Sequence, residues 1–146
     1  RVRALAGLDL IVIDYLQLMR TAGRSRGRYE DVTAISQDLK ALARDLDVPV
    51  LALSQLSRVC EQRGDKHPIL SDLRESGALE QDADAVLFLY RDEYYDPNTE
   101  HKNIAELNVA KHRHGPTGTV ALFFKKDLAT FVDAEIRRTQ IDTSWL

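Results

Sequence analysis

The sequence predicts an α/β fold in which parallel strands joined by a crossover helix are followed by antiparallel strands towards the C-terminal end. Three observations lead to this prediction. Short apolar runs rich in β-branched residues suit strands that are buried on both faces of a parallel sheet. The long segment between the first two runs carries an apolar stripe at helical spacing. The last third of the chain consists of short strand-like runs separated by turns that contain Gly or Asp.

The composition is that of an ordinary globular domain, because 44% of the 146 residues are hydrophobic and 29% are charged. No apolar run approaches the roughly 18 residues of a membrane-spanning helix, so we expect no membrane association. The net charge of −3 gives no global basic field, and any contact with nucleic acid must therefore be local. The chain begins at Arg1 without a signal peptide, and we expect a fragment or a processed product. The lone Cys60 is expected to be a small, partly buried hydrophobic residue.

The first half of the chain is predicted to form a strand, a helix and a second strand. Residues 8–14 are almost continuously apolar and end in Asp14, which predicts a buried strand with a polar tip. Residues 15–28 are polar and basic, which predicts a mobile loop. Residues 29–46 carry apolar side chains three and four positions apart, the pattern of an amphipathic helix. Residues 48–54 predict a second strand, parallel to the first through a right-handed crossover.

The second half is predicted to contain a loop, a short helix and four further strands. A loop over residues 55–68 precedes a short helix that Ser71 or Asp72 would cap. A strand is expected at residues 85–90, and a polar segment with a turn follows at residues 91–103. The pattern then predicts three antiparallel strands, with a hairpin turn at residues 115–118 between the first two: residues 104–110, 119–125 and 130–133.

Two polar residues are predicted to lie at the carboxyl ends of the first two strands. Asp14 ends the first strand and Gln55 follows the second. Because ligands of open parallel sheets bind at this edge, one crevice could hold both side chains. A carboxylate in such a position can hold the water shell of Mg²⁺ beside nucleotide phosphates, and an amide can sense the γ-phosphate or the attacking water. Taken alone, each is equally well explained as an ordinary polar residue that follows a strand.

Two further segments carry side chains that suit a polyanion. Lys111 and Arg113 alternate at a strand end, which predicts that they share one face and could stabilise the charge of a transferring phosphoryl group, including one on a neighbouring subunit. The alternative is a solvated basic hairpin tip. The segment Arg74-Glu75-Ser76-Gly77 has backbone amides that could bind a DNA phosphate. Its alternative is a plain capping sequence with an exposed ion pair.

Four motifs occur in the order that is typical of one protein family. They are IVIDYLQL at residues 11–18, LSQLSR at 53–58, DLRESGALEQDAD at 72–84 and KHRHGPTG at 111–118. With them the chain resembles the bacterial replicative DNA helicases of the DnaB family, over nearly its whole length. The resemblance implies that residues 1–146 are the second half of a RecA-like P-loop NTPase core, the C-terminal part of a helicase motor domain from the Walker B strand onward.

The resemblance also implies an activity for the complete protein. It implies a hexameric ring of identical subunits in the cytoplasm that couples the hydrolysis of ATP, with Mg²⁺, to translocation on single-stranded DNA and duplex unwinding. A primase and a helicase loader are the implied partner proteins.

Each candidate residue receives a role from the same resemblance. Asp14 would be the Walker B residue that binds Mg²⁺ through water. Gln55 would link the γ-phosphate to the DNA-facing loops. Lys111 and Arg113 would reach into the ATP site of the neighbouring subunit as basic fingers. The residues that would contact the DNA backbone are Arg74, Glu75 and Gly77.

The sequence departs from the family pattern in one respect. The phosphate-binding Gly-x-x-x-x-Gly-Lys-Ser/Thr loop and the glutamate that activates water lie upstream in this family, and neither occurs in these 146 residues. We therefore expect poor ATP affinity and no activity from the isolated chain. Two alternative hypotheses remain: a fragment of a recombinase ATPase of the RecA or RadA type, and a non-catalytic module that binds nucleic acid or helicase subunits.

Overall fold

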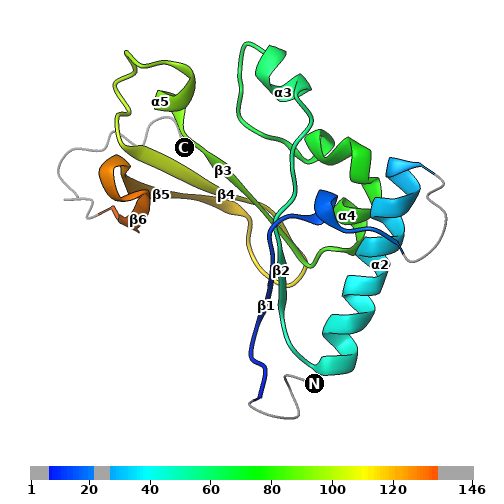
Figure 1. Ribbon diagram of the computed structural model, residues 1–146. Helices are drawn as coiled ribbons and strands as arrows, with labels where there is room; N and C mark the ends of the chain where they lie inside the picture. The colour runs from blue at the N-terminus through cyan, green and yellow to red at the C-terminus, as the bar shows by residue number, and fades with distance from the viewer. Residues whose placement is uncertain (1–6, 22–26, 135–146) are drawn as a thin grey trace. The chain divides into compact units, whose positions relative to one another are not determined.

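The computed structural model describes residues 7–21 and 27–134, except for the side chains of residues 74–76. The chain folds into two compact units, of which the first ends at Val86 and the second begins at Leu87 (Figure 1). Part of the predicted mobile loop, residues 22–26, lies outside the described residues. Among the helices that are described, none has the length and apolar character needed to cross a membrane.

The first unit contains a parallel pair of strands, β1 (Ile11–Ile13) and β2 (Val50–Ala52), connected through helix α2 (Arg28–Leu46). The pairing sets Ile13 opposite Ala52. The predicted order of strand, helix and parallel strand is therefore confirmed. The prediction of burial on both faces was wrong for the described chain, because Val12 and Leu51 are about half exposed.

Helix α2 contributes several residues to the buried core of the first unit. Its stripe includes Val32 and Ile35, which are both 4% exposed, as the helical spacing predicts. The acidic residues Glu30 and Asp31 lie in the first turn, where their negative charges interact favourably with the positive end of the helix dipole. The helix ends at Asp47 in a left-handed conformation. The buried apolar residues of the unit come from several elements: Leu16, Val32, Ile35, Val48, Cys60 and Leu73.

The stretch after β1 is only partly a loop. It contains the 3₁₀ helix η1 (Leu16–Leu18), in which Leu16 is 1% exposed while Leu18 is 65% exposed. The loop prediction was wrong at this point because one buried leucine within a polar stretch gives no periodic signal. Leu16 thus anchors the segment that follows the first strand.

Three short helical elements follow β2 in the first unit: α3 (Val59–Gln62), the 3₁₀ helix η2 (Leu70–Ser76) and α4 (Gly77–Asp82). The first was predicted as loop, since one helical turn has too few residues for an amphipathic pattern. The short helix expected from Ser71 or Asp72 is present, but it begins before both residues. Both η2 and α4 pack along α2 (Figure 1), and Ser36 of α2 donates a hydrogen bond of 2.8 Å to Asp82.

The second unit is built on a four-stranded sheet in the order β3-β4-β5-β6. Its strands are β3 (Ala85–Tyr90, which starts in the first unit), β4 (Ile104–His112), β5 (Gly118–Lys125) and β6 (Thr130–Asp133). The pairs β4–β5 and β5–β6 are antiparallel, as predicted. The inward positions of β3 include Phe88 and Tyr90, both buried.

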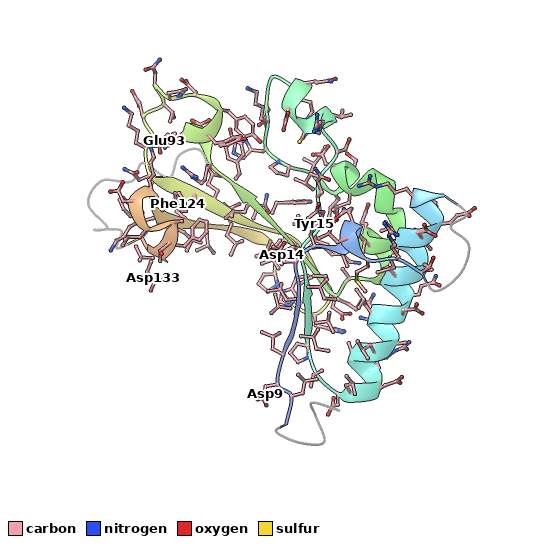
Figure 2. All side chains as sticks on the ribbon, viewed as in Figure 1. Asp9, Asp14, Tyr15, Glu93, Phe124 and Asp133 are labelled. Carbon is pink, nitrogen blue, oxygen red and sulfur yellow. The ribbon has the colours of Figure 1, made fainter. Side chains whose placement is uncertain are left out.

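The polar segment after β3 is held by several acidic side chains, among them Glu93 in the short helix α5 (Asp92–Tyr95) (Figure 2). Its carboxylate accepts the Asn103 amide hydrogen bond at 3.0 Å and forms an ion pair with Lys126 of η3 (Lys126–Leu128). These two partners hold the pKa of Glu93 below its usual value. The guanidinium of Arg91 lies 3.9 Å from the centre of the Phe124 ring.

We predict that Leu16→Ala lowers the free energy of unfolding by about 3 kcal/mol, because it leaves a cavity where a fully buried leucine stood. Leu18→Ala, in the same 3₁₀ helix but exposed, should change it by less than about 0.5 kcal/mol. Urea denaturation followed by circular dichroism measures both. Equal losses for the two variants would contradict the placement of η1.

Candidate functional site

The carboxyl ends of β1 and β2 lie at the same edge of the parallel sheet. Since Ile13 is paired with Ala52, Asp14 and Gln55 both follow their strands at this edge. Figure 2 shows Asp14 at one end of β1, with Asp9 at the other. Both candidate side chains are exposed. Within residues 7–21 and 27–134, no hydrogen bond or ion pair occupies the Asp14 carboxylate, so its oxygens are available to a ligand from outside.

A side chain that the sequence did not single out, Gln17 in η1, ties the two strand ends together. Its Nε2 donates to Ser54 Oγ at 3.0 Å and to the Gln55 carbonyl oxygen at 3.3 Å. Its Oε1 accepts a hydrogen bond of 3.2 Å from the Gln55 amide. The side-chain amide thus pairs with the Gln55 backbone on both its donor and its acceptor side. The Leu16 amide adds a bond of 2.9 Å to the Leu53 carbonyl oxygen.

The sequence contained only a weak signal for Gln17, which is its place inside the first motif. A glutamine three residues beyond a strand is usually solvated. Its role depends on the turn of η1, which brings the side chain back to the end of β2, and this turn depends on the buried Leu16. Gln17 therefore positions the backbone of Gln55.

The segment that leads to Arg74 is held by an ion pair between Arg63 and Asp72. Two parallel hydrogen bonds of 2.8 Å join the guanidinium to the two carboxylate oxygens. Arg63 also donates to the carbonyl oxygens of Asp65 at 3.3 Å and His67 at 2.7 Å. Asp72 is 4% exposed, and it also accepts the Ile69 amide at 2.9 Å as a cap of η2.

This geometry bears on the interpretation of the segment as a capping sequence. Asp72 does act as a capping residue, but it is buried, and its ionic partner lies nine residues earlier in the chain. Burial raises the pKa of Asp72. The hydrogen bonds from Arg63 and from the Ile69 amide lower the pKa by more, so it lies below the usual value of an aspartate.

Gly77 is the one predicted DNA-contacting residue whose surroundings are described in full. Its φ of −51° is an ordinary helical value, so the backbone conformation does not require glycine. A β-carbon at this position would meet the Tyr29 hydroxyl at 3.6 Å, an ordinary contact. Neither the backbone conformation nor the packing in the described part of the fold therefore requires glycine at this position. For Arg74 and Glu75 only the backbone, within η2, is described.

The two predicted basic fingers lie in the second unit, in different local structures. Lys111 belongs to β4, whereas Arg113 lies in the turn beyond the last strand residue, His112. Strand alternation therefore does not relate the two side chains directly, and the expectation that they share one face stays a prediction. Gly115 packs against the imidazole of His112, and a β-carbon at position 115 would collide with that ring. The hairpin thus needs glycine at this point or a displaced His112.

Comparison with known proteins identifies a family and several relatives. The family model of the DnaB-like helicase C-terminal domain matches residues 1–133. The chain is 57% identical over 138 residues to the replicative DNA helicase DnaC of Bacillus subtilis (strain 168), and 58% identical over 138 residues to the replicative DNA helicase DnaB of Geobacillus stearothermophilus. Both alignments cover 94% of this chain and only 30% of the relative.

Solved structures are similar to the chain over most of its length. One of them, the structure of an ATPase domain, superimposes with a TM-score of 0.86 and 57% identity, over 91% of this chain and 47% of that one. A DnaB-like replicative helicase, solved in a study of its interactions with primase, gives a TM-score of 0.86 and 57% identity over 91% of this chain and 32% of that one.

We predict that Asp72→Asn lowers the free energy of unfolding by about 2 kcal/mol at neutral pH, because it weakens charge-assisted hydrogen bonds to a buried group. Since the pKa of Asp72 is lowered in the folded protein, its stabilising effect is present above the ordinary value of 3.8 and is lost as the pH falls through the lower folded value. The difference between the two proteins should therefore shrink below about pH 4.

Denaturation at several pH values measures this dependence. Asp38→Asn, which changes an exposed carboxylate on α2, is the matched control and should leave stability almost unchanged. A difference for Asp72→Asn of the same size at pH 7 and at pH 3 would contradict the assignment of a charged Asp72.

Proposed function

The chain belongs to the family of the DnaB-like helicase C-terminal domain, and we propose that it acts as part of a hexameric replicative DNA helicase that couples ATP hydrolysis to translocation on single-stranded DNA and duplex unwinding. It would supply the C-terminal part of the RecA-like motor domain, from the Walker B strand onward. The observation that carries the proposal is the arrangement of Asp14 and Gln55 at one edge of a parallel sheet, with Gln17 joining their segments. This is the edge at which open parallel sheets bind ligands.

Asp14 would take part in the ATP site of its own subunit. Among the described residues no group of three or more His, Cys, Asp or Glu side chains is arranged to hold a metal ion. One available carboxylate fits a Mg²⁺ ion that keeps most of its water and takes its other ligands from ATP phosphates and from residues outside this chain. When bound, the ion would neutralise charge on the phosphates. Asp14 would hold and orient one of its water ligands.

Gln55 would respond to the γ-phosphate or to the attacking water. Its side chain is exposed, while its backbone is held on two sides by Gln17. This separation suits a sensor, because the backbone stays fixed while the amide is free to change partners. The segment that follows Gln55 then leads towards the residues that we assign to DNA.

Lys111 and Arg113 would act on ATP that is bound to the neighbouring subunit. They occupy the end of a hairpin in the second unit, and their positive charges suit the charge that develops on a transferring phosphoryl group. Such an arrangement makes hydrolysis depend on assembly, because one subunit completes the site of the next.

Single-stranded DNA would be contacted through the segment Arg74–Gly77. Arg74 suits a backbone phosphate, and the glycine lets the DNA approach the start of α4 closely. Glu75 would complete this contact. We further propose a cytoplasmic location and, as partner proteins, a primase and a helicase loader. The primase is suggested by the structural relative whose interactions with primase were studied.

The proposal predicts that Asp14→Asn and Arg113→Ala each abolish most ATP turnover in the full-length ring, because each removes one part of a composite site. Rings mixed from the two variants should regain turnover, since some interfaces then combine an intact Asp14 with an intact Arg113 from the neighbour. DNA-stimulated phosphate release measures this. Absence of recovery in mixed rings, or wild-type turnover by Arg113→Ala alone, would refute the assignment of Arg113 to the neighbour's site.

A second prediction concerns Gln17. Gln17→Leu removes the amide that holds the Gln55 backbone and should lower kcat for ATP about 10-fold to 100-fold, because small displacements of a reacting group are costly. Gln37→Leu, the same change on an exposed position of α2, is the matched control. Steady-state kinetics of the full-length protein distinguish them. Equal kcat values would exclude a positioning role for Gln17.

A further inference from the structure

We propose that Arg63 is a positioning residue that couples the Gln55 segment to the DNA-contacting segment Arg74–Gly77 through the buried carboxylate of Asp72. The inference rests on the proposed function, because it assumes that the first segment responds to ATP and the second binds single-stranded DNA. It adds a residue that neither motif assignment includes.

The first step is the link between the two segments. Ser57, two residues after Gln55, donates its backbone N–H to the carbonyl oxygen of Asp72 at 3.0 Å. Asp72 lies in η2, two residues before Arg74. A movement of the chain after β2 therefore reaches the start of the DNA-contacting segment through one direct hydrogen bond.

The second step is the fixation of Asp72. One hydrogen bond transmits a displacement only when its acceptor belongs to a rigid body. Arg63 supplies this rigidity, because its planar guanidinium forms two bonds of 2.8 Å to the carboxylate and also binds the carbonyl oxygens of Asp65 and His67. The loop before η2 and the first turn of η2 are thereby joined as one piece.

The third step is the burial of this contact. Asp72 is 4% exposed, so water is a poor substitute for a lost partner of its carboxylate. The Ile69 amide binds the same carboxylate at 2.9 Å, which ties its position to the start of η2. If Arg63 lost its forked contact, the orientation of η2 would become variable even where the core of the unit remained folded.

The test uses the full-length protein with ATP, Mg²⁺ and a single-stranded oligonucleotide. Arg63→Lys keeps the charge but loses the fork. We expect ATP turnover without DNA to stay close to wild type, while the stimulation of turnover by DNA falls about ten-fold and the affinity for the oligonucleotide falls with it. Lys40→Gln, which removes the ion pair between α2 and Asp84 in the same unit, is the matched control and should leave the stimulation unchanged.

A double-mutant cycle supplies a readout that a purely structural role would not move. If Gln17 and Arg63 act along one connection, their effects on DNA stimulation should be less than additive, whereas those of Gln17 and Lys40 should be additive. If Arg63→Lys does not form a ring, Asp72→Asn is used in its place. The same loss of DNA stimulation is then expected, with basal turnover close to wild type.

The experiment distinguishes a failure of the proposed function from a failure of the role of Arg63. A wild-type protein without DNA-dependent turnover would refute the proposed function itself. A wild-type protein with such turnover, together with an Arg63→Lys variant that keeps full stimulation and DNA affinity, would overturn only the role of Arg63. The role of Arg63 would also be overturned if Arg63→Lys lowered the melting temperature and reduced basal and DNA-stimulated turnover by the same factor. Arg63 would then contribute to stability alone.

Discussion

The parallel pairing of β1 with β2 is the constraint on which the candidate site depends. An antiparallel pair would send the two carboxyl ends to opposite edges, whereas the parallel register brings the residues after Ile13 and after Ala52 to the same edge. Helix α2 makes this possible, because a parallel connection needs a long crossover. Its buried stripe of Val32 and Ile35 holds the crossover in place. The polar chemistry at the edge is thus a consequence of apolar packing elsewhere in the unit.

The parts of the fold with regular patterns could be predicted from the sequence. Helix α2 was predicted from its apolar periodicity, and strand β3 and the antiparallel strands from short apolar runs bounded by polar segments and turns. The turn after β3 was predicted from its local chemistry, and the Asn98 amide indeed binds the Asp96 side chain at 2.8 Å. Family membership was predicted from four ordered motifs and is confirmed.

The remaining features depend on contacts between residues that are distant in the sequence. The pairing of Gln17 with Gln55 spans 38 positions, and no local pattern announces it. The sequence singled out Asp72 as a candidate helix cap, but nothing in it pointed to Arg63 as its partner. The burial of Asp72 and its contact with the half-buried Arg63 follow only once the loop folds back onto η2. The strand was predicted to end at residue 110, whereas β4 extends to His112 and the turn begins at Arg113, because the end of a strand depends on its pairing with a partner strand.

The residues that the sequence revealed differ in one physical respect from those that it did not. The side chains to which we assign chemistry, Asp14 and Gln55, are exposed and make few contacts within the described chain. A group that binds a ligand needs hydrogen-bonding positions that are not already occupied by partners in its own protein. The side chains that hold neighbouring segments in place have the opposite character. Gln17 and Arg63 use most of their hydrogen-bonding capacity on partners within the protein: backbone groups, the Ser54 hydroxyl and the Asp72 carboxylate. Motifs therefore reveal the first kind of residue, and only the three-dimensional arrangement reveals the second.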